Sequence, residues 1–111
     1  MIEQDIQKSI LDYLNFHGVA VKTGSGSVKL QDGRFFKITS GFNGGRGWFD
    51  IQFVYKGNVY LIEVKAPWGR LSDDQVFVHE AVKKHGVKPY ILHSLDEAIE
   101  MLKEINETQN N

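Results

Sequence analysis

The chain has 111 residues, of which 41% are hydrophobic and 24% charged, a composition typical of one soluble folded domain. It contains no cysteine, which excludes disulfides, thiolate metal sites and cysteine nucleophiles. The apolar runs are too short to span a bilayer, and the N-terminus lacks the apolar core of a signal peptide. We therefore expect an intracellular, cytoplasmic protein with no membrane partner.

The formal net charge is −1, but the basic groups are concentrated in the middle of the chain. Residues 20–70 hold eight basic side chains against three acidic ones, whereas both flanking segments are net acidic. This asymmetry predicts one basic face for phosphates, although chance scatter over a solvated surface explains the charges equally well. The basic residues that we expect to bind nucleic acid are Lys22, Arg34, Lys37, Arg46 and Arg70.

The first half of the chain predicts one helix followed by short strands. Apolar residues recur at helical spacing over residues 2–17, and residues 19–23 have the pattern of a strand. Residues 28–30 and 35–39 predict two more strands, joined through an Asp-Gly turn signal. The four glycines of residues 41–47 predict a loop.

The strongest strand pair covers residues 49–55 and 59–65, joined through Lys56, Gly57 and Asn58. Both strands are rich in β-branched and aromatic residues, and Pro67 ends the second one. These features predict a β-hairpin.

The last third of the chain predicts a helix, a strand and a helix. Ser72 and Gln75 have the spacing of a capping box, which opens a helix to about residue 85. Residues 89–93 predict a strand, and a second capping box at Ser94 and Glu97 opens a helix to about residue 105. The predicted class is therefore α/β, with a mixed central sheet flanked by helices in the order α-β-β-β-α-β-α. We expect one domain over residues 1–105 and a flexible polar tail over residues 106–111.

The hairpin carries the candidate site, which consists of Asp50, Glu63 and Lys65. Strand side chains alternate between faces, so Glu63 and Lys65 share one face. A two-residue loop of Lys56 and Gly57 places Asp50 opposite Glu63, and a loop of Gly57 and Asn58 places it opposite Lys65. A three-residue loop breaks the site unless a bulge compensates for it.

Two carboxylates that face each other on neighbouring strands repel, and a bound divalent cation reverses that interaction. Oxygen ligands with open positions suit Mg²⁺ or Mn²⁺, which can polarise a phosphoryl oxygen and activate a water. Lys65 can hold the attacking water or stabilise the charge on phosphorus. The alternative is an exposed acid and base that form a surface salt bridge.

Several motifs recur in order over nearly the whole chain: Glu3-x-x-Ile6-Gln7, Ile10-Leu11-x-x-Leu14, Gly47-x-x-Asp50, Ile62-Glu63-Val64-Lys65, Gly69-x-Leu71-Ser72-x-x-Gln75 and Ser94-Leu95-Asp96-Glu97-Ala98-Ile99. Together they resemble the PD-(D/E)XK nuclease superfamily, and within it the VRR-NUC group of virus-type replication-repair nucleases. The resemblance implies a restriction-endonuclease-like core and a metal-dependent phosphodiesterase. The sequence departs from the superfamily name at Phe49, where that name has proline.

The resemblance also implies the role of each site residue. Asp50, Glu63 and the Val64 carbonyl are the implied ligands of Mg²⁺ or Mn²⁺, Lys65 is catalytic, Glu3 lies near the metal waters, and Gln75 supports the active site. On the residues alone, Glu3 is explained by the helix dipole and Gln75 by the capping box.

Other residues allow more than one interpretation. The glycine loop presents Arg46 to a phosphate backbone, and because no Gly-Lys-Ser/Thr follows, we expect no nucleotide cofactor. Trp48 and Trp68 flank the site and can stack on exposed bases, but core packing is the stronger interpretation for Trp48. The four histidines, at positions 17, 79, 85 and 93, show no metal-binding spacing and are expected at the surface or at helix ends.

We therefore expect a DNA endonuclease, and the virus-type resemblance implies a phage or mobile-element protein that works in replication, repair or recombination. Cutting both strands of branched or Holliday-junction-like DNA needs two catalytic centres, which favours a homodimer. Its interface would use the aromatic residues Phe35, Phe36 and Phe42. The alternatives are a non-catalytic nucleic-acid-binding module and a subunit of a repair complex, and RNA is not excluded as a substrate.

Overall fold

The computed structural model describes residues 2–23, 26–29, 35–38 and 47–109. Its central sheet has the strand order β1 (Val19–Lys22), β4 (Ile51–Tyr55), β5 (Asn58–Val64) and β6 (Tyr90–Leu92). The first two pairings are antiparallel and the last is parallel. A parallel pairing needs a crossover, and α2 (Asp73–Lys84) lies within it. The predicted α/β class with a mixed sheet is confirmed.

Two further strands, β2 (Gly26–Lys29) and β3 (Phe35–Ile38), pair antiparallel in a separate sheet. They are inserted between β1 and β4, so the main sheet follows the predicted order once this hairpin is set aside. The predicted strands at 28–30 and 35–39 correspond to this pair with shifted ends. The predicted glycine loop lies outside the described residues, apart from Gly47.

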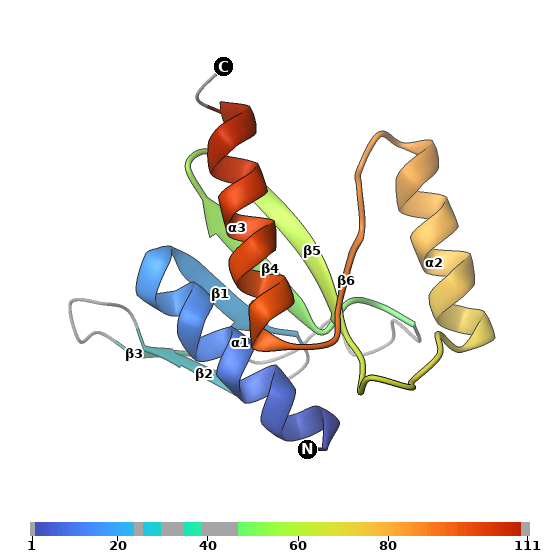
Figure 1. Ribbon diagram of the computed structural model, residues 1–111, viewed down its shortest axis with the longest axis horizontal. Coiled ribbons are helices and arrows are strands. Elements are labelled where there is room, and N and C mark those ends of the chain that lie inside the picture. The colour runs from blue at the N-terminus through green and yellow to red at the C-terminus, as the bar shows by residue number, and fades with distance from the viewer. Residues whose placement is uncertain (1, 24–25, 30–34, 39–46, 110–111) are drawn as a thin grey trace.

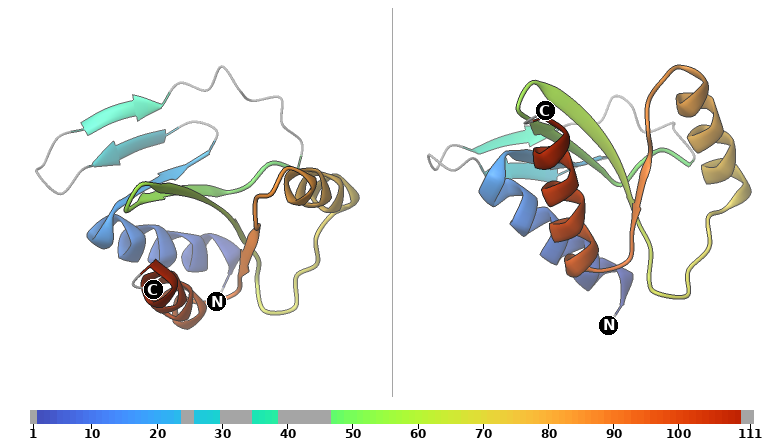
Figure 2. Two further views of the ribbon diagram at one scale, coloured as in Figure 1. Left: turned by 90° about the horizontal axis from the view of Figure 1, so that it is seen from above. Right: turned by 45° about the horizontal axis from the view of Figure 1, so that its top comes forward.

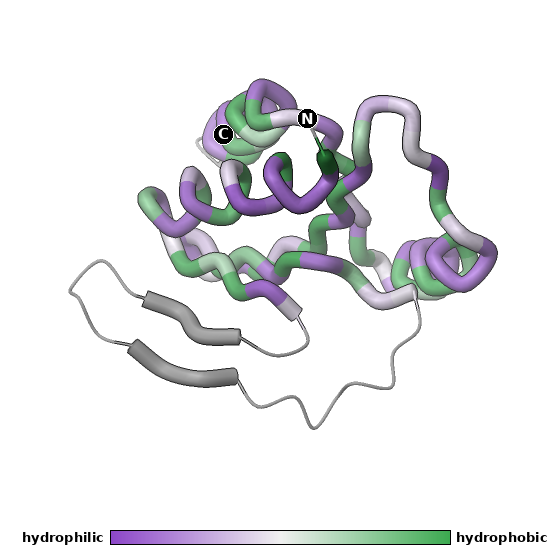
Figure 3. The backbone as a smooth tube through the Cα atoms, turned by 90° about the horizontal axis from the view of Figure 1, so that it is seen from below, coloured by the Kyte–Doolittle hydropathy of each residue, from purple (hydrophilic) through white to green (hydrophobic). Residues whose placement is uncertain are grey.

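Two helices cover one face of the sheet, and the third stands apart from them. The helices α1 (Glu3–His17) and α3 (Leu95–Gln109) lie side by side on that face, whereas α2 lies on the other side of β6 (Figures 1 and 2). Hydrophilic and hydrophobic positions alternate along α1 (Figure 3), and Ile6, Ile10 and Leu14 are its buried residues. These side chains pack with the inward residues of the sheet and of α3, including Phe53, Ile62 and Leu102. The core thus forms between the helix pair and the sheet, and the opposite face of the sheet is left for Glu63.

The β4–β5 hairpin has the first of the two predicted two-residue loops, the one formed by Lys56 and Gly57. Tyr55 pairs with Asn58, so Lys56 and Gly57 form the loop, with φ of 47° and 86°. Two consecutive residues with positive φ define a type I′ turn, whose twist matches that of the flanking strands. Continued one residue beyond the last pair, Ile51 with Ile62, a regular register would place Asp50 opposite Glu63.

Replacing Lys56 with asparagine should stabilise the protein by about 0.5–1 kcal/mol, because asparagine tolerates positive φ better than lysine. The exposed contact from Lys56 Nζ to Asn106 Oδ1 (3.2 Å) is lost, but Tyr55 Oη still donates to the same oxygen at 2.6 Å. Urea denaturation of Lys56→Asn and Lys56→Ala measures the difference. Alanine keeps the strain and loses the contact, so an equal gain in both variants would contradict the explanation.

The ends of several elements differ from the sequence-based expectation. The strand predicted from residue 49 begins at Ile51, because Asp50 leaves the regular ladder. The last helix, predicted to end near residue 105, continues to Gln109, and Asn106 is held there by Tyr55. Among the described residues, no helix has both the length and the apolar character needed to cross a membrane.

Candidate active site

Asp50 is fixed at the point where β4 begins. Its backbone N–H donates to Ile62 O (3.0 Å), although Ile62 is already the register partner of Ile51. Two residues of one strand thus face one residue of the other, which is the count of a β-bulge. The Asp50 carbonyl accepts the Thr23 N–H (2.9 Å), and its carboxylate Oδ2 accepts the Val64 N–H (2.8 Å). These bonds aim the carboxylate at the end of β5.

Glu63 is buried on the sheet face opposite the main core, with 1% of its surface exposed. Burial raises the pKa of Glu63 to about 9, and the neighbouring Asp50 carboxylate adds to this increase by hydrogen bonding and charge. Lys65 opposes the shift. Among the described residues, Glu63 Oε1 has no hydrogen-bond partner. A buried acid that faces a second acid and has an unpaired oxygen is costly unless it serves a site.

Gln75 combines the two roles that the sequence allowed. Its Oε1 accepts the Ser72 N–H at 2.8 Å, and Ser72 Oγ accepts the Gln75 N–H at 3.2 Å, which completes the capping box of α2. Its Nε2 donates to Glu63 Oε2 at 3.2 Å. The cap therefore fixes the direction from which the amide reaches Glu63.

His79 was missed by the sequence analysis, and its predicted surface or helix-end position is wrong. It is 3% exposed, its ring stacks on Phe49 (centroids 4.5 Å apart, 19° between planes), and its Nε2 lies 3.5 Å from Glu63 Oε1. Burial is the largest cause that lowers the pKa of His79, which favours the neutral form of the ring. The spacing Gln75-x-x-x-His79 contained the signal, because residues four apart share one face of a helix.

Lys65 and Glu3 approach the same end of β5. The Lys65 N–H donates to Leu92 O (3.0 Å), which carries the pairing with β6 one residue past the strand, and its ammonium lowers the pKa of Glu63. Glu3, in the first turn of α1, accepts the Ala66 N–H at 3.4 Å, and its negative charge raises the pKa of Glu63. The structure therefore brings Glu3 of α1 and Gln75 of α2 to the hairpin residues Asp50, Glu63 and Lys65.

The donor atoms here suit a hard divalent cation. Within the described part of the chain, no three His, Cys, Asp or Glu side chains form a cluster that could hold a metal. Mg²⁺ needs no such cage, because it binds through one or two carboxylates and keeps several waters. The neighbouring carboxyl groups of Asp50 and Glu63 supply oxygens, and Oε1 of Glu63 has no hydrogen-bond partner in the described structure. The Val64 N–H points at Asp50, and the N–H and C=O of a strand residue face the same neighbour, so the Val64 carbonyl is available on that side.

The predicted nucleic-acid contacts are described only in part. Lys22 is exposed at the end of β1, opposite Ile51, and Arg70 is exposed between Lys65 and α2. Arg34, Arg46 and Phe42 lie outside the described residues, as do the side chains of Lys37, Phe35 and Phe36. Trp48 is half-buried with its ring edge-on to Phe49 (5.5 Å), whereas Trp68 is 95% exposed.

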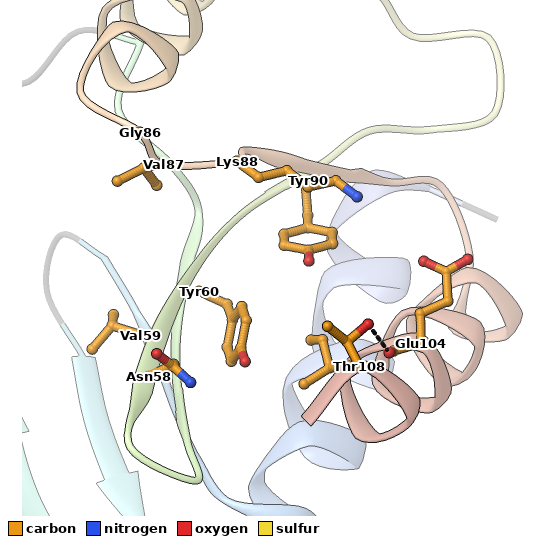
Figure 4. Close-up of a pocket in the computed structure, with 10 residues that line it drawn as sticks. Asn58, Val59, Tyr60, Gly86, Val87, Lys88, Tyr90, Glu104 and Thr108 are labelled. Atoms are coloured by element: carbon orange, nitrogen blue, oxygen red, sulfur yellow. Dashed lines mark hydrogen bonds between the residues drawn. The ribbon is translucent and has the colours of Figure 1, made fainter. Parts of the chain in front are cut away.

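A cavity of about 400 Å³ lies at the opposite end of β5, between β6 and α3 (Figure 4). Tyr60 and Tyr90 meet there edge-to-face with centroids 6.1 Å apart, and Thr108 Oγ1 donates to Glu104 O at 2.9 Å. Glu63 is five residues further along β5 than Asn58, which lines the cavity, a span of roughly 17 Å at the usual strand rise. The cavity is therefore separate from the carboxylate site.

Comparison with known proteins gives a match in structure but not in sequence. No family model matches the chain, and no curated protein does. A solved structure described as a VRR_NUC domain superposes with a TM-score of 0.69 at 17% sequence identity, covering 91% of this chain and 94% of that one. At this identity the likeness establishes the fold. The restriction-endonuclease-like core predicted from the sequence is thus confirmed, and the chain has the fold of a VRR_NUC domain.

Proposed function

We propose that the protein is a metal-dependent DNA endonuclease. The observation that carries the proposal is the buried Glu63 at the end of β5, whose carboxyl group lies beside the Asp50 carboxylate. A sheet gains no stability from burying one acid beside another, whereas a cation site requires two such carboxylates. The VRR_NUC fold supports the nuclease assignment.

Each residue has a distinct part in this proposal. Asp50, Glu63 and the Val64 carbonyl would hold Mg²⁺ or Mn²⁺, which supplies Lewis-acid polarisation of a phosphoryl oxygen and a more acidic water. Lys65 orients the attacking water and balances the negative charge that develops on the phosphate oxygens. Glu3 accepts hydrogen bonds from waters near the site, and Gln75 holds Glu63 from α2.

The proposed substrate is branched DNA, cut inside the cell during replication, repair or recombination. One domain of this size offers one catalytic centre, so symmetric cuts in both strands of a junction require a C₂ homodimer. Sedimentation at micromolar concentration measures the oligomeric state directly. A monomer that still cuts both strands of a junction at symmetric positions would contradict the dimer.

The proposed activity is tested by cleavage of a labelled four-way junction and a matched linear duplex in Mg²⁺, Mn²⁺ or EDTA. Lys65→Ala should lose about 10²–10³-fold in rate, the usual effect of removing one group that stabilises developing charge. Lys103→Ala, an exposed lysine of α3, is the matched control and should cut like the wild type. Binding without cleavage in every metal would replace the nuclease with a binding module.

Trp68→Ala should weaken DNA binding by about 1–3 kcal/mol, the usual worth of stacking one base on an aromatic ring. Trp68 follows Pro67 in a tight turn closed by the bond from Gly69 N–H to Ala66 O (2.8 Å), and its ring is 95% exposed to solvent. Anisotropy titrations in the Lys65→Ala background measure affinity without cleavage. Trp68→Phe keeps a stacking surface and should lose less, so equal losses in both variants would contradict stacking.

A further inference from the structure

The interactions of α2 with the sheet converge on one carboxylate. All residues of α2 are described, and His79 is the buried one among them, whereas Val76 and Phe77 of the same helix are 46% and 75% exposed. His79 and Gln75 reach the two oxygens of Glu63, at 3.5 Å and 3.2 Å. The polar contacts of α2 with the sheet thus meet at Glu63, beside the stacking of His79 on Phe49.

The contact between His79 and Glu63 leaves two polar atoms without a partner. Glu63 Oε1 and His79 Nε2 are both buried, both lack a hydrogen bond within the described structure, and face each other at 3.5 Å. A buried neutral imidazole with no partner is costly, and a shift of a few tenths of an ångström would close a hydrogen bond. The stacking on Phe49 holds the ring in the plane from which Nε2 meets that oxygen.

We infer that His79 is a positioning residue for Glu63, donating its Nε2–H to Oε1 while the Gln75 amide donates to Oε2. The inference rests on the proposed function, in which the ionised Glu63 binds the metal. Outer hydrogen-bond partners of a metal-binding carboxylate fix its orientation, and losing one typically costs 10–100-fold in metal affinity. The two donors lie one helical turn apart, so α2 sets the orientation of Glu63 as a unit.

The test uses two substitutions that separate stacking from hydrogen bonding. His79→Phe keeps a ring against Phe49 and removes the donor, whereas His79→Gln loses the ring and restores an N–H. Metal affinity is read from the rise in melting temperature with Mg²⁺ and Mn²⁺ concentration. We expect His79→Phe to bind 10–100-fold more weakly while its metal-free melting temperature is equal to or higher than that of the wild type, and we expect His79→Gln to recover part of the affinity.

A residue with a merely structural role cannot lower the metal affinity when it is replaced and leave the metal-free melting temperature unchanged or higher. Wild-type affinity in His79→Phe, or a loss that only follows a lower melting temperature, would overturn the inference. His79 would instead be a metal ligand if His79→Gln recovered no metal affinity and the affinity for Mn²⁺ fell more than that for Mg²⁺. That result would also overturn the positioning role.

A metal-independent measurement separates this inference from the proposed function. In EDTA, the carboxyl ¹³C resonance of Glu63 should move in His79→Phe and stay in place in His85→Phe, which changes an exposed histidine at the end of α2. If the resonance moves in His79→Phe but the wild-type protein binds no metal, the proposed nuclease activity is overturned and the pairing of His79 with Glu63 stands. An unmoved resonance would overturn the pairing whatever the protein does with metals.

Discussion

Glu63→Gln should abolish metal-dependent cleavage and at the same time make the metal-free protein more stable. The loss of a ligand removes several kcal/mol of Lewis-acid stabilisation, which corresponds to about 10³-fold in rate. The stability gain follows because the substituted amide is neutral at every pH, so folding no longer has to protonate a carboxylate that is ionised in the unfolded chain, and the side-chain volume is almost unchanged. A cleavage assay in Mg²⁺ and thermal melting in EDTA measure the two effects on one preparation.

The size of the stability gain depends on pH in a defined direction. The pKa of Glu63 is raised to about 9 in the folded protein by burial and by Asp50, from a usual value of 4.5. A raised pKa contributes stability that is complete below pH 4.5 and is lost as pH rises towards 9. Metal-free wild type should lose roughly 3 kcal/mol between about pH 4.5 and about pH 7, and Glu63→Gln should lack this part of the decline.

A matched substitution checks that the effect belongs to the site. Glu100→Gln changes an exposed carboxylate of α3 in the same way and should alter neither cleavage nor the pH dependence of melting. Saturating Mg²⁺ should restore the wild type at about pH 8, because a ligand that binds only the folded state stabilises it. A lower melting temperature for Glu63→Gln than for the wild type at that pH in EDTA would show that the buried Glu63 beside Asp50 does not destabilise the protein.

The sequence predicted the hairpin site because its signals are local. The two-residue loop at Lys56 and Gly57 and the alternation of β5 fix which side chains share a face, so Asp50 and Glu63 could be placed opposite each other by counting. The bulge at Asp50 could not be counted in this way. It depends on the Thr23 and Val64 hydrogen bonds, which come from different parts of the chain.

His79 shows why the rest of the site was missed. A histidine on an otherwise ordinary helix is usually exposed, and only the docking of α2 against Phe49 buries this one. The end of α3 was missed for a related reason, since Asn106 has a low helix propensity but accepts the Tyr55 hydroxyl across 51 residues of sequence. Tertiary contacts determine both the burial of His79 and the end of α3.

Gly47→Ala should destabilise the protein by about 2–5 kcal/mol and weaken the metal site with it. Gly47 has a φ of +81°, which costs alanine about 1–2 kcal/mol. A Cβ there would also lie 2.5 Å from the carbonyl carbon and oxygen of Asp74 and 2.7 Å from Gln75 N, all of which are backbone atoms. Relieving that overlap costs about 1–3 kcal/mol more and moves the first turn of α2 away from the sheet.

Gly86→Ala is the control, because Gly86 has a φ of +86° and a Cβ there would meet nothing within 4 Å. The strain of positive φ is common to both variants, so the difference in urea stability between them isolates the overlap with α2. Metal affinity should fall only in Gly47→Ala, since the displaced turn carries Gln75 and with it the donor to Glu63. Equal stabilities and equal affinities in the two variants would show that the approach of Gly47 to α2 contributes nothing to the site.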